Sequence, residues 1–246
     1  MISEEEILSS LKEYIIVKDK DNKIVYSNVD NPRSFEEKLI CRGSFSQNIT
    51  DNTDYQLSKN IVLAIDNQMY TIYTYSKCNV NDYLTNVLKR EFFETAFYTI
   101  ADKYNSFVII MGDVDKFKDI NDNYGHQIGD RVLNYVGKVL QNNMTKDDIV
   151  GRYGGEEFIM CLPNRNIEDA YNLVEKIRTE ISSVPLCVEN EKVNVTITFG
   201  VANYSYNKTY DELVYEADSA LLYGKNSGRN KTIIYTYKVK QKRFPN

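Results

Sequence analysis

The sequence lacks the features that mark cysteine-based metal sites, membrane spans and secretion. None of its four cysteines, at positions 41, 78, 161 and 187, forms a CxxC pair, which excludes a cysteine-based metal site. No run approaches the ~20 consecutive apolar residues of a membrane span, and residues 1–6 are acidic where a signal peptide is basic. We therefore expect a cytoplasmic protein with reduced, buried thiols and no membrane partner.

An excess of basic residues is also missing. The formal net charge is −5, which argues against general nucleic-acid binding, so no nucleic-acid partner is expected. The basic stretch at residues 238–243 is interpreted as a solvated tail. What is present is the composition of a globular protein: 246 residues, 42% hydrophobic and 26% charged, enough for one or two domains.

The chain divides near residue 80, which predicts one domain over residues 1–80 and another over residues 81–246. In the first, apolar segments at 14–17 and 24–26, and again at 61–65 and 69–75, flank polar turns and predict two hairpins. The stretch from 28 to 58 is polar and predicted to be irregular. The run at 16–28 resembles a small α+β PAS-type sensor module, and a β-rich packing or dimerisation module without a ligand is the open alternative.

After residue 80, predicted helices and strands alternate. Apolar residues recur at helical spacing within 132–140, 170–181 and 213–221, while they alternate with polar residues or glycine over 193–201, as in a strand. Helices packed over a mixed sheet predict an α/β sandwich.

Acidic residues follow two predicted strands in this second region. The apolar run at 107–111 predicts a buried strand that leads into Asp113. The pair Gly154 and Gly155 lies between two apolar segments and predicts a β-hairpin whose tip carries Glu156 and Glu157. If this hairpin lies beside the strand, Asp113 and Glu156 can share Mg²⁺ ions, which prefer one or two carboxylates plus substrate phosphates. Two such ions would form a phosphoryl-transfer site.

Five short motifs in this region resemble the GGDEF family of diguanylate cyclases in order and spacing, over roughly residues 82 to 237. They are Asp113 to Asp122 (DVDKFKDIND), Tyr124-Gly125-His126, Gly129-Asp130, Arg152 to Phe158 (RYGGEEF) and Lys225 to Asn230 (KNSGRN). Glu156 stands where the family more often has Asp, a variant that active members also use. The resemblance implies a palm-like nucleotidyl cyclase fold with a central mixed sheet flanked by helices.

The resemblance also implies the residues of a metal and catalytic centre. Asp113, Glu156 and the backbone carbonyl of Val114 would hold two ions of Mg²⁺, or of Mn²⁺. Glu156, or as second choice Glu157, would accept the proton of the attacking hydroxyl. Lys118 would neutralise phosphate charge, with a plain solvated lysine as the alternative.

A second group of matching residues would bind the substrate. Lys225 and Arg229 would neutralise further phosphate charge. Asn121 and Asp130 would read guanine, because Asp accepts from the N1–H and the exocyclic amine of the base and Asn supplies both a donor and an acceptor. His126 would be a direct ligand or, alternatively, a turn-capping histidine.

The implied reaction condenses two GTP molecules into cyclic di-GMP and two pyrophosphates. Each domain would hold one GTP, and the two sites must face each other, so the reaction requires a homodimer that forms at least transiently. A catalytically silent GTP-binding module and a cyclase that makes a mixed GMP–AMP dinucleotide are the alternatives. The intact acidic residues argue against the first, and Asp130 argues against the second.

Three segments depart from the pattern of the family. Residues 82–90, predicted to form the opening helix, lack the Gly, Leu, Pro and Asn that the family usually has at 86–89. Many members carry an inhibitory Arg-x-x-Asp motif where this chain has residues 145–148, which begin with threonine, so weak product feedback is expected. The six residues 76–81 that separate the last predicted strand from residue 82 are too few for a heptad, so no coiled-coil linker is expected.

Overall fold

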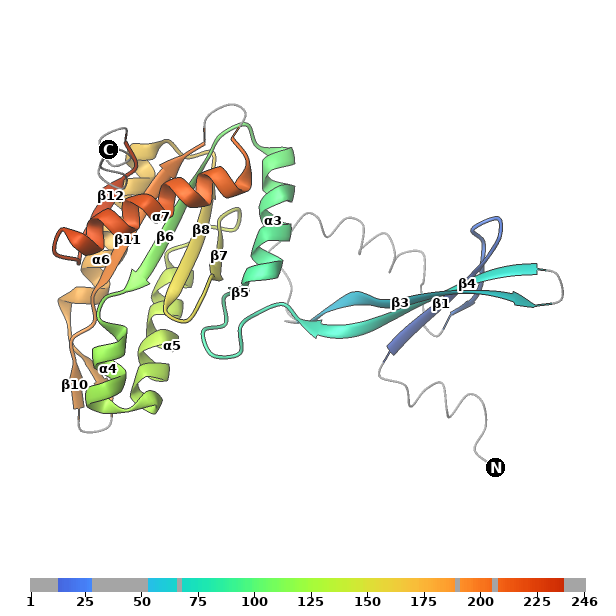
Figure 1. Ribbon diagram of the computed structural model, residues 1–246, viewed down its shortest axis with the longest axis horizontal. Coiled ribbons are helices and arrows are strands. Elements are labelled where there is room, and N and C mark those ends of the chain that lie inside the picture. Colours follow the sequence, from blue (N-terminus) through green and yellow to red (C-terminus); the bar gives the residue numbers. More distant parts are fainter. Residues whose placement is uncertain (1–12, 28–52, 66–67, 189–190, 205–207, 237–246) are drawn as a thin grey trace, which may run out of the picture. The chain divides into compact units, whose positions relative to one another are not determined.

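The computed structural model describes residues 13–27, 53–65, 68–188, 191–204 and 208–236 (Figure 1). Contacts within the chain divide it into two compact units, Met1–Val80 and Asn81–Asn246. No helix in these described ranges is long and apolar enough to cross a membrane.

The first unit contains a four-stranded antiparallel sheet in the order β2-β1-β4-β3. Its strands are β1 (Glu13–Asp19), β2 (Ile24–Ser27), β3 (Thr53–Ile65) and β4 (Gln68–Asn79). Both predicted hairpins are present as strand pairs, β1 with β2 and β3 with β4. The first turn is closed by Asp19, whose side chain accepts hydrogen bonds from the backbone N–H groups of Asp21 and Lys23 at 3.0 and 2.9 Å.

Two sequence-based boundaries in this unit are wrong. Residues 53–58, predicted to be irregular, form the start of β3, because they pair with the last residues of β4. For the same reason residues 76–79, predicted as linker, continue β4. Residues 28–52 and the basic stretch at 238–243 lie outside the described residues, and the resemblance to a PAS module stays a prediction.

The second unit is built on a six-stranded mixed sheet in the order β12-β11-β6-β8-β7-β5. These strands are β5 (Leu88–Lys89), β6 (Phe107–Val114), β7 (Ile149–Arg152), β8 (Glu157–Pro163), β11 (Ile197–Asn203) and β12 (Thr232–Ile234). The outer pairs β11–β12 and β5–β7 are parallel and the inner pairs are antiparallel. Every residue of the central strand β6 is buried, as its apolar run predicts.

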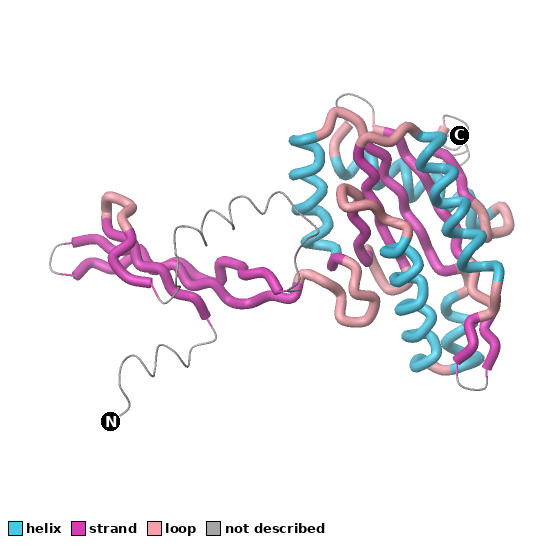
Figure 2. Tube along the Cα trace, turned by 180° about the vertical axis from the view of Figure 1, so that it is seen from behind, coloured by secondary structure: helices cyan, strands magenta, loops and turns pink. Residues whose placement is uncertain are grey.

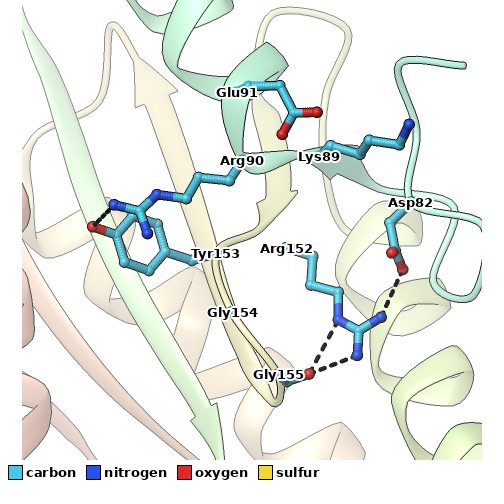
Figure 3. Close-up of a pocket in the computed structure, with 8 residues that line it drawn as sticks. All are labelled: Asp82, Lys89, Arg90, Glu91, Arg152, Tyr153, Gly154 and Gly155. Atoms are coloured by element: carbon cyan, nitrogen blue, oxygen red, sulfur yellow. Dashed lines mark hydrogen bonds and ion pairs between the residues drawn. The ribbon is translucent and has the colours of Figure 1, made fainter. Parts of the chain in front are cut away.

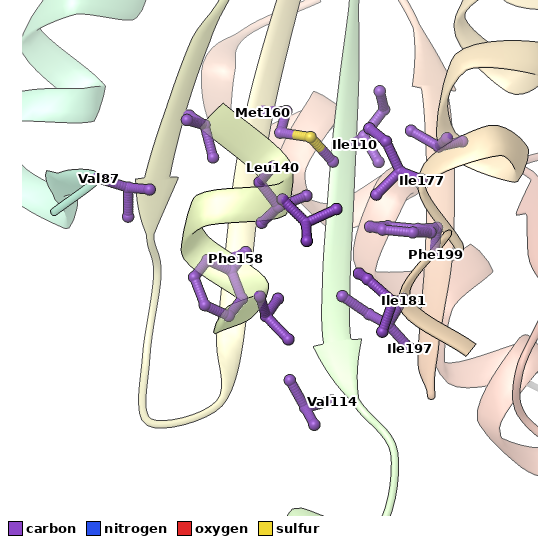
Figure 4. Close-up of a cluster of buried hydrophobic side chains, with 14 of the residues drawn as sticks. Val87, Ile110, Val114, Leu140, Phe158, Met160, Ile177, Ile181, Ile197 and Phe199 are labelled. Atoms are coloured by element: carbon purple, nitrogen blue, oxygen red, sulfur yellow. The ribbon is translucent and has the colours of Figure 1, made fainter. Parts of the chain in front are cut away.

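Helices cover both faces of this sheet (Figures 1 and 2). One face carries α5 (His126–Asn142) and α6 (Ile167–Ser183), and the other carries α3 (Arg90–Lys103) and α7 (Tyr210–Asn226). Alternate residues of β6 serve the two cores: Ile110 packs with Leu140 and Ile177 (Figure 4), while the Phe107 ring lies 5.3 Å from that of Phe97 on α3. The predicted α/β class with a mixed sheet flanked by helices is confirmed.

The opening helix predicted over residues 82–90 is wrong. The segment forms a turn and then the short strand β5, and the helix α3 begins at Arg90. The Asp82 carboxylate accepts hydrogen bonds from the backbone N–H and the hydroxyl of Thr85 at 2.9 and 2.7 Å, and Asn86 adopts a left-handed φ of 59°. A side chain that bonds the backbone and a left-handed residue both interrupt an α-helix.

Two smaller predictions also need correction. The strand expected over 193–201 is divided into β10 (Glu191–Val193), which pairs with β9 (Leu186–Val188), and β11, because the backbone leaves strand geometry at residues 194–196. Cys161 is buried as expected, but Cys187 on β9 is exposed, because side chains alternate along the strand and its neighbours Leu186 and Val188 take the more buried positions.

Candidate active site at the glycine hairpin

The end of β6 lies beside the hairpin formed by β7 and β8. The two hairpin strands pair antiparallel, and β8 pairs with β6 in a register that places Glu157 opposite Asp113. The turn is closed by the backbone N–H of Tyr153, which donates to the carbonyl of Glu157 at 2.8 Å, and the N–H of Val114 donates to the carbonyl of Glu156 at 3.2 Å. The arrangement expected from the sequence, with hairpin and strand side by side, is therefore confirmed.

Asp113 is the most buried of the predicted carboxylate ligands, with 3% of its surface exposed. Its carboxylate lies 2.6 Å from the ammonium group of Lys225, at the end of α7. Burial raises the pKa of Asp113 to about 6, Lys225 opposes this rise, and the negative charges of Glu156 and Glu157 add to it. The site thus brings three carboxylates and one cation together at the end of β6.

The glycines leave the hairpin tip open on one side. A Cβ atom at Gly155 would meet nothing within 4 Å, whereas one at Gly154 would lie 2.8 Å from a carboxylate oxygen of Glu157. Neither glycine has a positive φ, so the bare backbone serves close approach and not a left-handed turn.

Arg152 braces the turn from within (Figure 3). Its Nε and Nη2 donate to the carbonyl of Gly155 at 3.1 and 2.7 Å, and its Nη1 donates to the Asp82 carboxylate at 3.0 Å. Burial alone would raise the pKa of Asp82, but the hydrogen bonds from Thr85 and the pairing with Arg152 outweigh it and lower that pKa. Arg152 is therefore a salt-bridge partner of Asp82 and a hydrogen-bond donor to the hairpin turn.

A cavity of 270 Å³ lies against this brace (Figure 3). On its wall the Arg90 guanidinium stacks 4.0 Å from the centre of the Tyr153 ring and donates to the Tyr153 hydroxyl at 3.0 Å. The cavity is lined by Asp82, Lys89, Arg90, Glu91, Arg152, Tyr153, Gly154 and Gly155.

The residues expected to bind guanine lie on α4 (Phe117–Tyr124) and on α5. The Oδ1 atom of Asn121 is buried and has no hydrogen-bond partner among the described residues. It lies so close to α5 that a Cβ atom at Gly129 would be 1.9 Å from it, so a larger residue there would displace the Asn121 side chain. Asp130 follows on the exposed surface of α5. A buried acceptor without a partner is rare in folded proteins and marks a place where a ligand can donate.

The remaining predicted residues are exposed. Lys118 lies on α4, His126 is the first residue of α5, and Arg229 lies in the turn after α7 with a φ of 61°. Exposed side chains are available to a ligand, but no contact in the described part of the chain ties Lys118 or His126 to the carboxylates.

Sequence reasoning missed the role of Asp115. Its carboxylate is 5% exposed and accepts hydrogen bonds from Thr196, Thr198 and the backbone N–H of Asn230. The donors lie at least 81 residues away in the chain, so the only available signal was a second acidic residue two positions after Asp113.

The family model described as "Diguanylate cyclase, GGDEF domain" matches residues 79–231. The chain belongs to the GGDEF family. Diguanylate cyclase A of Treponema denticola is 34% identical over 198 residues, which are 74% of this chain and 52% of that protein. The chain spans about half the length, or less, of the curated relatives it matches.

Solved structures of GGDEF domains are similar in fold. The GGDEF domain of DgcB from Caulobacter crescentus, in complex with c-di-GMP, has a TM-score of 0.62 at 31% identity and covers 63% of this chain and 93% of that one. The active GGEEF domain of a diguanylate cyclase from Vibrio cholerae has a TM-score of 0.55 at 32% identity, covering 61% and 97%. That domain shares the glutamate that this chain has at position 156.

The donor set of this GGDEF domain suits a hard cation that also binds substrate. GGDEF diguanylate cyclases use divalent metal ions. Within the described ranges, no three or more His, Cys, Asp or Glu side chains are grouped so that they could hold a metal ion. Asp113 and Glu156 repel each other, and a cation would relieve this repulsion. Two such carboxylates fit the preference of Mg²⁺ for few protein ligands.

The segment of this GGDEF domain that corresponds to the inhibitory motif is a closed turn. Asp148 is 1% exposed, and its carboxylate accepts hydrogen bonds from the N–H and hydroxyl of Thr145, both at 2.8 Å. Arg165 donates to the same oxygen at 2.7 Å. The aspartate that remains from the motif is therefore engaged within the protein.

Proposed function

We propose that this chain is a diguanylate cyclase that condenses two GTP molecules into cyclic di-GMP and two pyrophosphates. The observation that carries the proposal is the meeting of Asp113, Glu156 and Glu157 with Lys225 beside an open glycine turn. Carboxylates for cations and a lysine for phosphate charge are the parts that phosphoryl transfer requires. The names of the curated relatives point to the same reaction.

In the proposed site, Asp113, Glu156 and the carbonyl of Val114 hold two Mg²⁺ ions, for which Mn²⁺ can substitute. When bound, the ions neutralise phosphate charge and make the attacking hydroxyl more acidic. Glu156 accepts the proton of that hydroxyl, and Glu157, opposite Asp113 in the sheet register, is the second candidate. The hydrogen bond between Val114 and Glu156 supports this assignment because it joins the two ligand-bearing segments.

The substrate is proposed to lie between the helices α4 and α5 and the end of α7. Asn121 and Asp130 read guanine, and the buried, unpartnered Oδ1 of Asn121 supports the assignment. Phosphate charge is neutralised by Lys118, Lys225 and Arg229. His126, exposed at the first residue of α5, is proposed as a further contact with the nucleotide.

Two copies of the chain must cooperate in this reaction. The 3′-hydroxyl oxygen of each GTP attacks the α-phosphate of the GTP in the other copy. Each attack forms one new P–O bond and breaks the bond between that α-phosphorus and the oxygen bridging to the β-phosphate, so two pyrophosphates leave. A homodimer, at least a transient one, is therefore part of the proposal. Residues 1–80 are proposed as a PAS-like regulatory module, and a cytoplasmic setting is proposed because GTP is a cytoplasmic nucleotide.

Mass spectrometry of the products formed from GTP and Mg²⁺ by the full chain tests the proposal. We expect cyclic di-GMP and pyrophosphate from the parent, and a loss of at least about 100-fold in Glu156→Gln, which removes one ligand charge without a change in volume. Glu168→Gln, at an exposed position on α6, is the matched control and should keep full activity. Bound but unconverted GTP would favour the silent module, and a mixed dinucleotide from GTP with ATP would favour the other alternative.

A further inference from the structure

Asp115 lies two residues after the proposed metal ligand Asp113, but its side chain is fully engaged by the protein. One carboxylate oxygen accepts from the hydroxyl of Thr198 at 2.6 Å. The other accepts from the hydroxyl of Thr196 at 2.8 Å and from the backbone N–H of Asn230 at 2.9 Å. Hydrogen bonds to a charged acceptor are among the stronger ones in proteins, so a cation would have to displace well-made contacts.

The turn that Asp115 contacts has an unusual backbone. Gly228, Arg229 and Asn230 have φ angles of 109°, 61° and 44°, all in the left-handed region. Glycine adopts this region freely, but Arg229 and Asn230 do so only where surrounding structure holds them.

Two contacts hold Asn230 in this turn. The Asp115 carboxylate binds its backbone N–H, and Arg178 on α6 donates to its side-chain oxygen at 2.8 Å. Arg178 is itself fixed by two hydrogen bonds to Glu175, both of 2.8 Å. The backbone after α7 is therefore clamped between the end of β6 and the helix α6.

Asp113 and Asp115, at the end of β6, thereby anchor both ends of the segment 225–230, which carries Lys225 and Arg229. Asp113 pairs with Lys225 on the last turn of α7, and Asp115 holds Asn230 five residues later. Arg229 lies between these anchors with its side chain exposed. The direction of the Arg229 side chain is set by a backbone that the hydrogen bond from the Asn230 N–H to the Asp115 carboxylate maintains.

We propose that Asp115 is a positioning residue for phosphate binding: it fixes the left-handed turn that directs Arg229 to the phosphate groups of the nucleotide, and it is not a metal ligand. This inference rests on the proposed function, in which Arg229 neutralises phosphate charge. The positioning role requires the hydrogen bonds of the Asp115 side chain in their present geometry, and it does not require the negative charge of that side chain.

This last point separates the proposal from a metal-binding role. In Asp115→Asn the side-chain oxygen can still accept from Thr196 and Asn230, while the amide N–H₂ donates to the Thr198 hydroxyl. Calorimetry with inorganic triphosphate and Mg²⁺ reports the phosphate site without base recognition or turnover. We expect Asp115→Asn to bind within about threefold of the parent and Asp115→Ala to bind about tenfold more weakly. An Asp115→Asn loss as large as that of Asp115→Ala would overturn the proposal.

A double-mutant cycle with Arg229→Ala tests whether Asp115 acts through Arg229. In the Arg229→Ala variant, adding Asp115→Ala should lower triphosphate affinity by less than about twofold, because the Arg229 side chain that Asp115 positions is already absent. Equal losses in both backgrounds would show a merely structural role. Thr198→Val removes one hydrogen-bond donor to Asp115 without a change in shape. It should weaken triphosphate binding less than Asp115→Ala does, and it replaces Asp115→Ala in the test if that variant does not fold.

Product analysis on the same proteins distinguishes failure of the positioning role of Asp115 from failure of the proposed cyclase reaction. Triphosphate binding by a parent that makes no cyclic di-GMP would refute the proposed reaction, while the cycle would still decide the role of Asp115. Absence of triphosphate binding by the parent would overturn the positioning role, because no phosphate site would exist to be organised.

Discussion

At the scale of single residues, the charged form of Asp113 lowers the stability of the folded protein. A carboxylate that is 3% exposed and faces two other carboxylates is more costly when charged than one in water, even with Lys225 beside it. A structural aspartate in this place would carry hydrogen bonds like those of Asp115. This excess of negative charge is what the proposed cation would neutralise.

The raised pKa of Asp113 predicts how stability depends on pH. Between its ordinary value of 3.8 and about 6, the folded protein holds a proton that the unfolded chain has lost, so stability falls as pH rises through this window. Asp113→Asn removes this dependence. In EDTA, its melting temperature should match the parent near pH 4 and exceed it by a few degrees above pH 6.5.

Asp102→Asn is the control for this comparison, because Asp102 is exposed near the end of α3. Its melting temperature relative to the parent should not change between pH 5 and 7. A difference between Asp113→Asn and the parent that is constant over the whole pH range would contradict the raised pKa.

Asp130 gives a prediction about the choice of base. Asp130→Ser should relax the preference for GTP over ATP by about tenfold or more, because a site rejects the wrong base strongly only while its acceptor is present. Competition of ATP against GTP in product formation measures the change. Asp119→Ser, at an exposed position on α4, is the control. Unchanged selectivity in Asp130→Ser would remove Asp130 from the guanine site.

At the scale of elements, the hairpin and β6 could be predicted because their signals are local. Two glycines between apolar runs and a fully apolar strand are readable without knowledge of partners. The helix predicted over 82–90 rested on the resemblance to the family, whereas the left-handed Asn86 and the hydrogen bonds from Thr85 to Asp82 decide the shape of this segment. The break before β11 was missed because the alternation of apolar residues continues through it.

The roles of contacts distant in sequence could not be predicted at all. Asp115 meets donors from β11 and from the turn after α7, and only the folded sheet places these segments at the end of β6. The pair of Arg90 and Tyr153 joins residues 63 positions apart. Such contacts leave no periodic pattern in the sequence.

The closed turn at residues 145–148 predicts weak feedback by product. Thr145 has no guanidinium for a bound dinucleotide, and the Asp148 carboxylate is buried and paired with Arg165. We expect Glu156→Gln to bind cyclic di-GMP no more tightly than about 10 μM, since neither motif residue is available. Calorimetry measures this.

Thr145→Arg extends the test of the inhibitory segment. It restores the arginine of the motif, but it should add little affinity for cyclic di-GMP, because Asp148 stays engaged with Arg165. Sub-micromolar binding to either variant would show that the segment still forms an inhibitory site.

At the scale of the whole molecule, the two units are joined without a helix. The described chain passes from the last strand of the first unit, β4, which ends at Asn79, through the turn at Asp82 and the strand β5 to α3, which begins at Arg90. A coiled coil needs several heptads of continuous helix, and residues 80–89 contain none. For the proposed homodimer we therefore expect pairing through the first unit or through nucleotides that bridge two active sites.

This connection predicts a strong dependence on protein concentration. A fragment of residues 79–246 keeps the six-stranded sheet and its core, so it should fold, and without nucleotide it should be monomeric by light scattering. Its rate of product formation should rise with about the square of its concentration, because two loaded copies must collide. The full chain should show a linear dependence if residues 1–80 dimerise and the same square dependence if they do not. A stable dimer of the fragment without nucleotide would place the pairing surface on the cyclase unit and would contradict this account.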